Sequence, residues 1–114
     1  MLTEKDYCDY DTCVALKELG YDDSTDLRYN SYGSLGDFLG GIKAPTLYEA
    51  QKWLREAHNL HIEITYSPSC WTGKIYDLKK RDYIKGFTFF ESFEETLHIL
   101  IKEAVKILKE KDND

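Results

Sequence analysis

The sequence predicts an α+β fold: an N-terminal helix, a loop, a second helix, a three-stranded antiparallel meander, and a C-terminal helix packed on one sheet face. Two segments, Thr46 to Glu49 and Ser92 to Glu95, place a hydroxyl residue three positions before a glutamate at the head of an apolar-periodic run. This capping-box pattern marks two helix starts, because hydroxyl and carboxylate satisfy backbone donors of the first turn. Three short β-rich runs lie between them. At 114 residues and 42% apolar, we expect one domain over residues 1–114.

The N-terminal helix has a clear end and several candidate starts. Thr3 could open a long helix, or Asp9 or Asp11 could cap a shorter one. The helix should end at Leu19, because Gly20 supplies the left-handed residue that closes a helix. Its apolar face comprises Cys8, Thr12, Ala15, Leu16 and Leu19.

Residues 22–45 form the long loop, which the sequence predicts to be irregular or partly β. Residues 27–32 alternate loosely and could form a short strand, whereas the stretch from Gly33 to Gly41 is rich in glycine. A loop of this length in a small domain is usually functional or mobile.

The second helix is expected from Leu47 to His58, with Asn59 ending it. Residues 60–66 then alternate strictly between apolar and polar, the pattern of a half-buried antiparallel strand. Trp53 should pack on the sheet face that bears Ile62 and Ile64. The buried stripe of this helix is predicted to be Leu47, Ala50, Trp53, Leu54 and Ala57.

The rest of the chain should form two further strands, residues 71–78 and 83–90, and a final helix over residues 93–109. The final helix has a wide apolar stripe. Ile99, Val105 and Ile107 make it wider than a monomer needs, which favours a partner or a homodimer.

The formal charge of −6 lies wholly in the first quarter of the chain, because residues 1–26 hold eight acidic and two basic residues. The remaining acids and bases balance. This distribution tells against a general nucleic-acid binder, which needs clustered cations to displace counterions from phosphates. The local exception is the turn of Lys79, Lys80 and Arg81.

Candidate catalytic and metal-binding motifs are sparse. Cys8, Cys13, His58 and His61 carry atoms that zinc prefers, but their spacing matches no compact zinc motif. We therefore expect no metal, no cofactor and no enzymatic activity. The two cysteines should pack as small apolar groups, and His98 should face solvent.

Two further motif types are lacking. The glycine-rich stretch has no Gly-Lys-Ser/Thr ending, and no serine sits in a nucleophile elbow. The sequence also contains no run of about 18 apolar residues and no signal-peptide pattern at its start. Together with three cysteines that make a poor disulfide framework, this predicts a cytoplasmic protein.

Nine tyrosines are the most unusual compositional feature. Tyrosine is typical of contact surfaces, because it offers a large area at low rotamer entropy; amphipathic residues covering a small core explain the enrichment equally well. The leading hypothesis is a non-catalytic module that binds an unknown protein partner. Its predicted contact residues are Tyr29, Tyr32, Asp22, Asp23 and Asp26.

Segments 7–21 and 44–56, and the run from Phe90 into Lys106, resemble small uncharacterised proteins encoded in prophages and mobile elements of gut bacteria. The resemblance covers most of the chain except the loop from about Asp22 to Lys43. It implies a prophage or mobile-element accessory protein, and it brings no activity, cofactor or site residue.

The alternative function is a weak nucleic-acid-binding or antitoxin-like module that uses Lys79, Lys80 and Arg81. The order helix, three strands, helix also occurs in double-stranded-RNA-binding domains. Here, however, the final helix starts with Glu94 and Glu95, which would repel phosphates. The likeness to antitoxin domains is likewise one of architecture and confers no function.

Overall fold

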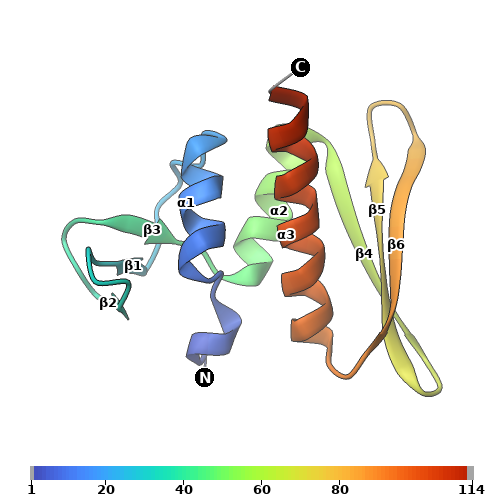
Figure 1. Cartoon of the computed structure of the whole chain (residues 1–114), viewed down its shortest axis with the longest axis horizontal. Helices are drawn as coiled ribbons and strands as arrows, with labels where there is room; N and C mark the ends of the chain where they lie inside the picture. The colour runs from blue at the N-terminus through green and yellow to red at the C-terminus, as the bar shows by residue number, and fades with distance from the viewer. Residues whose placement is uncertain (1, 113–114) are drawn as a thin grey trace.

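A computed structural model gives the structure of residues 2–112. The α+β class is confirmed: helices and antiparallel strands alternate along the chain (Figure 1). The elements in chain order are the 3₁₀ turn η1 (Glu4–Asp6), α1 (Tyr10–Glu18), β1 (Leu27–Tyr29), β2 (Leu35–Gly36), β3 (Ile42–Ala44), α2 (Leu47–His58), β4 (Leu60–Ser67), β5 (Cys70–Asp77), β6 (Asp82–Phe90) and α3 (Phe93–Asp112).

The helix boundaries follow the capping signals closely. The Thr46 hydroxyl accepts the Glu49 N–H at 3.1 Å, and the Glu49 carboxylate accepts the Thr46 N–H at 2.8 Å. Asn59 ends α2 in the left-handed conformation, with φ of 58°. At the first helix, Asp9 is the N-cap and accepts the Thr12 N–H at 2.9 Å. Of the candidate starts, Asp9 is therefore the one that opens α1.

The loop at residues 22–45 contains three short strands, so the prediction that it is partly β is confirmed. Strands β1, β2 and β3 form a separate small antiparallel sheet in the order β2-β1-β3. Residues 2–112 therefore form two three-stranded sheets. The expectation of one meander is incomplete, because β2 and β3 are too short to show an alternating pattern.

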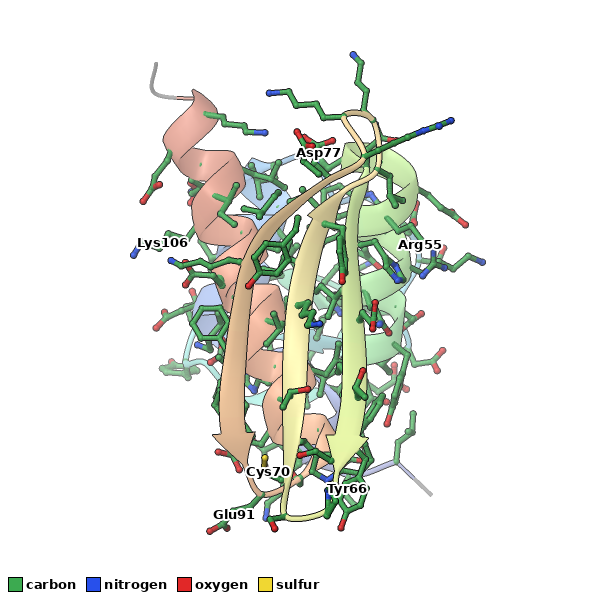
Figure 2. All side chains as sticks on the ribbon, turned by 90° about the vertical axis from the view of Figure 1, so that its right-hand side faces the viewer. Arg55, Tyr66, Cys70, Asp77, Glu91 and Lys106 are labelled. Atoms are coloured by element: carbon green, nitrogen blue, oxygen red, sulfur yellow. The ribbon has the colours of Figure 1, made fainter. Side chains whose placement is uncertain are left out.

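The large sheet has the predicted meander order, β4-β5-β6, with antiparallel pairing throughout. Apolar side chains of β4 and β5, such as Ile62 and Ile75, are buried on the face that packs against the helices. Figure 2 looks onto the opposite face, with Asp77 at one end and Tyr66 and Cys70 at the other.

The elements stack in layers (Figure 1). Helices α2 and α3 lie side by side on one face of the large sheet, with α3 against β4 and β5 and α2 against β4. Helix α3 also contacts α1, and α1 in turn lies against β3 of the small sheet. This sandwiched position explains the wide stripe of α3. Val105 is buried, and Ile99 and Ile107 pack against the core. The packing within one chain therefore accounts for much of this wide stripe, and the homodimer stays a prediction.

The stripe of α2 is narrower than predicted. Leu47, Ala50 and Leu54 are fully buried, whereas Ala57 is exposed and Trp53 is half-buried. The Trp53 ring stands edge-on to Tyr21, with 5.3 Å between ring centroids. Trp53 therefore packs against the edge of the core and not at its centre, whereas the adjacent Leu54 is fully buried.

Among the helices of residues 2–112, none combines the length and the apolar character that crossing a membrane requires.

Candidate functional site

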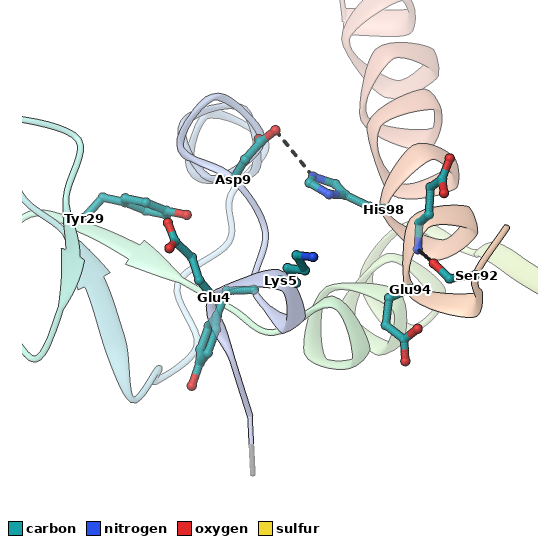
Figure 3. Close-up of a pocket in the computed structure, with 9 residues that line it drawn as sticks. Glu4, Lys5, Asp9, Tyr29, Ser92, Glu94 and His98 are labelled. Atoms are coloured by element: carbon teal, nitrogen blue, oxygen red, sulfur yellow. Dashed lines mark hydrogen bonds and ion pairs between the residues drawn. The ribbon is translucent and has the colours of Figure 1, made fainter. Parts of the chain in front are cut away.

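The N-terminal segment, α1 and the start of α3 enclose a cleft of about 460 Å³. Asp9 reaches it from the N-cap of α1, and His98 comes from the second turn of α3 (Figure 3). Glu4 and Lys5 stand at its other side in the 3₁₀ turn. We call this hollow the acidic cleft; it is lined by Glu4, Lys5, Tyr7, Asp9, Tyr29, Ser92, Glu94, Glu95 and His98.

The carboxylate of Asp9 organises one wall of the acidic cleft. It caps α1, forms an ion pair with Lys102, and lies 3.4 Å from Nε2 of His98. Burial would raise the pKa of Asp9, but the hydrogen bonds from Lys102 and Thr12 outweigh it and lower the pKa to about 2. Asp9 is therefore anionic at neutral pH, and it ties α1 to α3.

The side chain of His98 is half-buried, so the expectation that it faces solvent is wrong. Its Nε2 atom is buried and makes no hydrogen bond with the described residues. Its pKa is lowered because the ring is desolvated, and the nearby carboxylate of Asp9 offsets that only in part. Burial therefore disfavours the charged imidazolium form of His98.

The cleft carries more negative than positive charge. Four carboxylates line it, against the single ammonium of Lys5. Glu94 and Glu95 occupy the first turn of α3, where the helix dipole favours negative charge. Ser92 caps that helix by accepting the Glu95 N–H at 3.0 Å. The helix start thus positions two carboxylates beside the N-terminal segment.

A second hollow, the N-terminal groove, has a volume of about 560 Å³ and lies between the N-terminal segment and the small sheet. Glu4 and Tyr7 line both hollows, so the cleft and the groove meet along residues 4–7. The groove is lined by Leu2, Thr3, Glu4, Tyr7, Leu27, Gly33, Ser34 and Leu35.

The two tyrosines predicted to bind a partner differ in solvent exposure. Tyr29 is 5% exposed, and its hydroxyl donates to the carbonyl oxygen of Cys8 at 2.8 Å. It is a structural residue, so its prediction as an exposed anchor is wrong. Tyr32 is 92% exposed in the turn between β1 and β2. Phe38 and Leu39, in the next loop, also expose apolar surface.

The predicted acidic contact residues are all exposed, but they do not form one cluster. Asp22 pairs with Lys43 at 3.1 Å, and Asp23 lines a different hollow beside Trp53. Asp26 faces Tyr7, whose pKa is raised by burial and, secondly, by this carboxylate. Of the three aspartates, Asp26 is the one near the N-terminal groove.

The basic turn of Lys79, Lys80 and Arg81 connects β5 to β6, and all three side chains are exposed. The Asp77 carboxylate accepts the N–H groups of Lys79 and Lys80, both at 3.0 Å. This turn lies at the end of the large sheet marked by Asp77 in Figure 2. The acidic cleft adjoins the other end, because β6 runs from the basic turn to the start of α3.

The cysteines and histidines considered for zinc do not assemble. Within residues 2–112, no three or more His, Cys, Asp and Glu side chains are grouped so that they could hold a metal ion. Cys8 and Cys13 are buried, and the pKa of the Cys8 thiol is raised well above its ordinary value by its contact with Cys13 and by burial. They pack as small apolar groups, as predicted.

Sequence reasoning missed Glu94, Glu95 and His98 as members of the site. The capping signal at Ser92 located the start of α3 but not the segment that lies opposite it. The pairing of Asp9 with Lys102 spans most of the chain, and no local pattern announces such a contact. The sequence offered only two separate signals: an acidic residue, Asp9, at a candidate helix cap, and a basic residue, Lys102, on the last helix.

Comparisons with protein-family models, with curated proteins and with solved structures give no match for this chain.

Proposed function

We propose that this protein is a non-catalytic interaction module that binds a basic segment of a partner protein along the acidic cleft and the N-terminal groove. The observation that carries this proposal is the junction of the two hollows at Glu4 and Tyr7, with carboxylates on the cleft side. Complementary charge would steer a lysine- or arginine-containing segment towards the cleft. The neighbouring groove would receive its apolar side chains.

Exposed apolar groups near the groove supply the anchoring area that such a contact needs. Leu2 is half exposed at one end of the groove. Tyr32 directly precedes Gly33 and Ser34, which line the groove. Tyrosine is among the residue types that are enriched where binding energy is concentrated. In this proposal Tyr32 replaces the buried Tyr29 as the tyrosine anchor.

The arrangement of Asp9 and His98 supports a structural role better than a catalytic one. A general base must reach the proton that it removes. The His98 nitrogen that faces Asp9 is buried, and the Asp9 carboxylate is engaged by Lys102 and by the α1 backbone. Asp9 and its partners on α3 hold two helices together. They therefore contribute charge to the cleft and no accessible reactive atom.

An accessory role in a prophage or mobile element remains a prediction that depends on the resemblance alone. It is compatible with a small binding module. A cytoplasmic location is likewise part of the proposal.

The test combines affinity capture from the native host with site variants. Bound proteins would be identified with the wild type and with a Glu4→Gln/Tyr32→Ala variant, whose side chains are both exposed. The matched control is Glu63→Gln/Tyr83→Ala, because those residues are also exposed but belong to the large sheet. We expect a specific partner to be lost with the first variant and retained with the second.

A mobility-shift assay at near-physiological salt tests the alternative, in which the basic turn binds nucleic acid. The turn has three exposed cations, and binding through it would weaken steeply as salt rises. Tight nucleic-acid binding that disappears in a Lys79→Gln/Lys80→Gln/Arg81→Gln variant would replace the proposed function. Equal loss of the captured protein in both double variants would also contradict it.

A further inference from the structure

Another hollow lies on another part of the small sheet, between that sheet and α1, and its volume is about 200 Å³. Three cationic side chains line it: Lys17 from α1, Arg28 from β1 and Lys43 from β3. We call it the cationic pocket. Only Lys17 of these three cations comes from residues 1–26, which carry the whole net charge of −6.

Two of these cations face each other across the sheet. Arg28 and Lys43 are direct partners in the antiparallel pairing of β1 with β3, and both line the pocket. Like charges placed directly opposite each other in a sheet are unfavourable. A bound anion would relieve that repulsion.

The protein compensates these charges only in part. Lys43 donates to the backbone oxygen and the carboxylate of Asp22, at 2.8 and 3.1 Å. Among the side chains that the structure describes, Arg28 and Lys17 take part in no hydrogen bond or ion pair. Three cations against one carboxylate leave the lining with an excess of two positive charges.

The surroundings strengthen electrostatic attraction inside the pocket. Cys13 and Tyr21, which also line it, are almost fully buried. Arg28 is half-buried and the Lys43 side chain is 25% exposed, whereas Lys17 is exposed. Charges beside such buried walls interact more strongly than charges surrounded by water. The volume is smaller than the roughly 300–1,000 Å³ of common small-molecule sites, so a compact ligand fits best.

We propose that the cationic pocket binds a small oxyanion of the phosphate class, with Arg28 as its principal ligand. A planar guanidinium can donate two parallel hydrogen bonds to such an anion, and the lysines would add point charges. The anion is either free phosphate or a phosphoryl group carried by a larger molecule. This site is separate from the acidic cleft, so its failure would leave the proposed function untouched.

The experiment measures thermal stability and amide chemical shifts while inorganic phosphate is added. Sodium chloride of equal ionic strength serves as the blank, because screening alone also changes stability. We expect a saturable rise in melting temperature, with amide shifts centred on Arg28 and Lys43. Arg28→Gln should weaken phosphate binding about tenfold or more, since a charge-assisted contact is lost.

Arg55→Gln is the matched control, because Arg55 is a half-buried arginine of α2 outside the pocket lining. It should bind phosphate like the wild type. A parallel titration with O-phosphoserine separates the two sources: tighter binding than inorganic phosphate identifies a carried phosphoryl group, and weaker binding identifies the free ion. Absence of any saturable effect, or an equal effect in Arg28→Gln, overturns the proposal.

Discussion

The hydroxyl of Tyr29 donates a hydrogen bond to the carbonyl oxygen of Cys8 at 2.8 Å. This contact joins the small sheet to the residue that precedes the cap of α1. Burial raises the pKa of Tyr29 to about 12, so the phenol remains a donor throughout the physiological range. A residue that looked like a surface anchor in the sequence is thus part of the framework.

Tyr29→Phe should therefore destabilise the protein by about 1–2 kcal/mol, because the buried Cys8 carbonyl loses its strongest donor. Chemical denaturation would measure the loss. Tyr83→Phe is the control, since Tyr83 is 58% exposed, and it should change stability by less than about 0.5 kcal/mol. Equal effects of the two variants would contradict the structural role of Tyr29.

Two neighbouring glycines should respond very differently to alanine. Gly41 has φ of +97°, and an added Cβ would lie 2.2 Å from the Tyr29 carbonyl oxygen. Gly41→Ala should cost more than about 2 kcal/mol, because both backbone strain and a clash are introduced. Gly40 has open space around the same position, so Gly40→Ala should be nearly neutral. Similar melting temperatures for the two variants would contradict the close approach of Gly41 to the Tyr29 carbonyl oxygen.

Helix α2 contains a fully buried residue, Leu54, next to a half-buried one, Trp53, and their substitutions can be compared. Leu54 is 0% exposed, and Leu54→Ala should cost about 2–5 kcal/mol through the cavity that it leaves. Trp53 is half-buried and contacts the rings of Tyr21 and His58. Trp53→Ala should therefore cost less than Leu54→Ala despite its larger side chain. Urea unfolding of both variants decides the order.

Asp9→Asn should reduce the acid sensitivity of the protein. The Asp9 pKa falls from 3.8 to about 2 in the folded state, so its stabilisation is complete above pH 4 and is lost as pH falls towards 2. Asparagine keeps the helix cap but not the charge. The wild type should lose more stability than the variant over this window. At pH 7 the variant should be less stable by at most about 1 kcal/mol, because the pair is partly exposed.

Titration of His98 followed by NMR provides a second measurement on the contact between Asp9 and His98. The His98 pKa lies below its ordinary value of 6.5 because the ring is desolvated. The Asp9 carboxylate raises it, whereas Lys102 on the same helix lowers it further. Asp9→Asn should therefore lower the His98 pKa further. A rise would mean that the carboxylate does not act on this imidazole.

Much of the secondary structure could be read from local signals. The capping box at Thr46 and the left-handed Asn59 bound α2 at the predicted residues. The alternation over residues 60–66 identified β4 to within one residue. These features depend on interactions between near neighbours in the chain, which is why the sequence alone determines them.

Tertiary structure decided which faces became buried and which charges met. Trp53 and Leu54 are adjacent in sequence, and only the packing of α2 against its neighbours placed Leu54 inside. Tyr29 became buried because its strand joins a second sheet, and Asp9 meets Lys102 because α1 lies against α3. Such contacts join residues far apart in the chain, so no local pattern encodes them. The sequence by itself determined the class of fold and the caps of its helices, whereas the acidic cleft and the cationic pocket exist only once the layers pack.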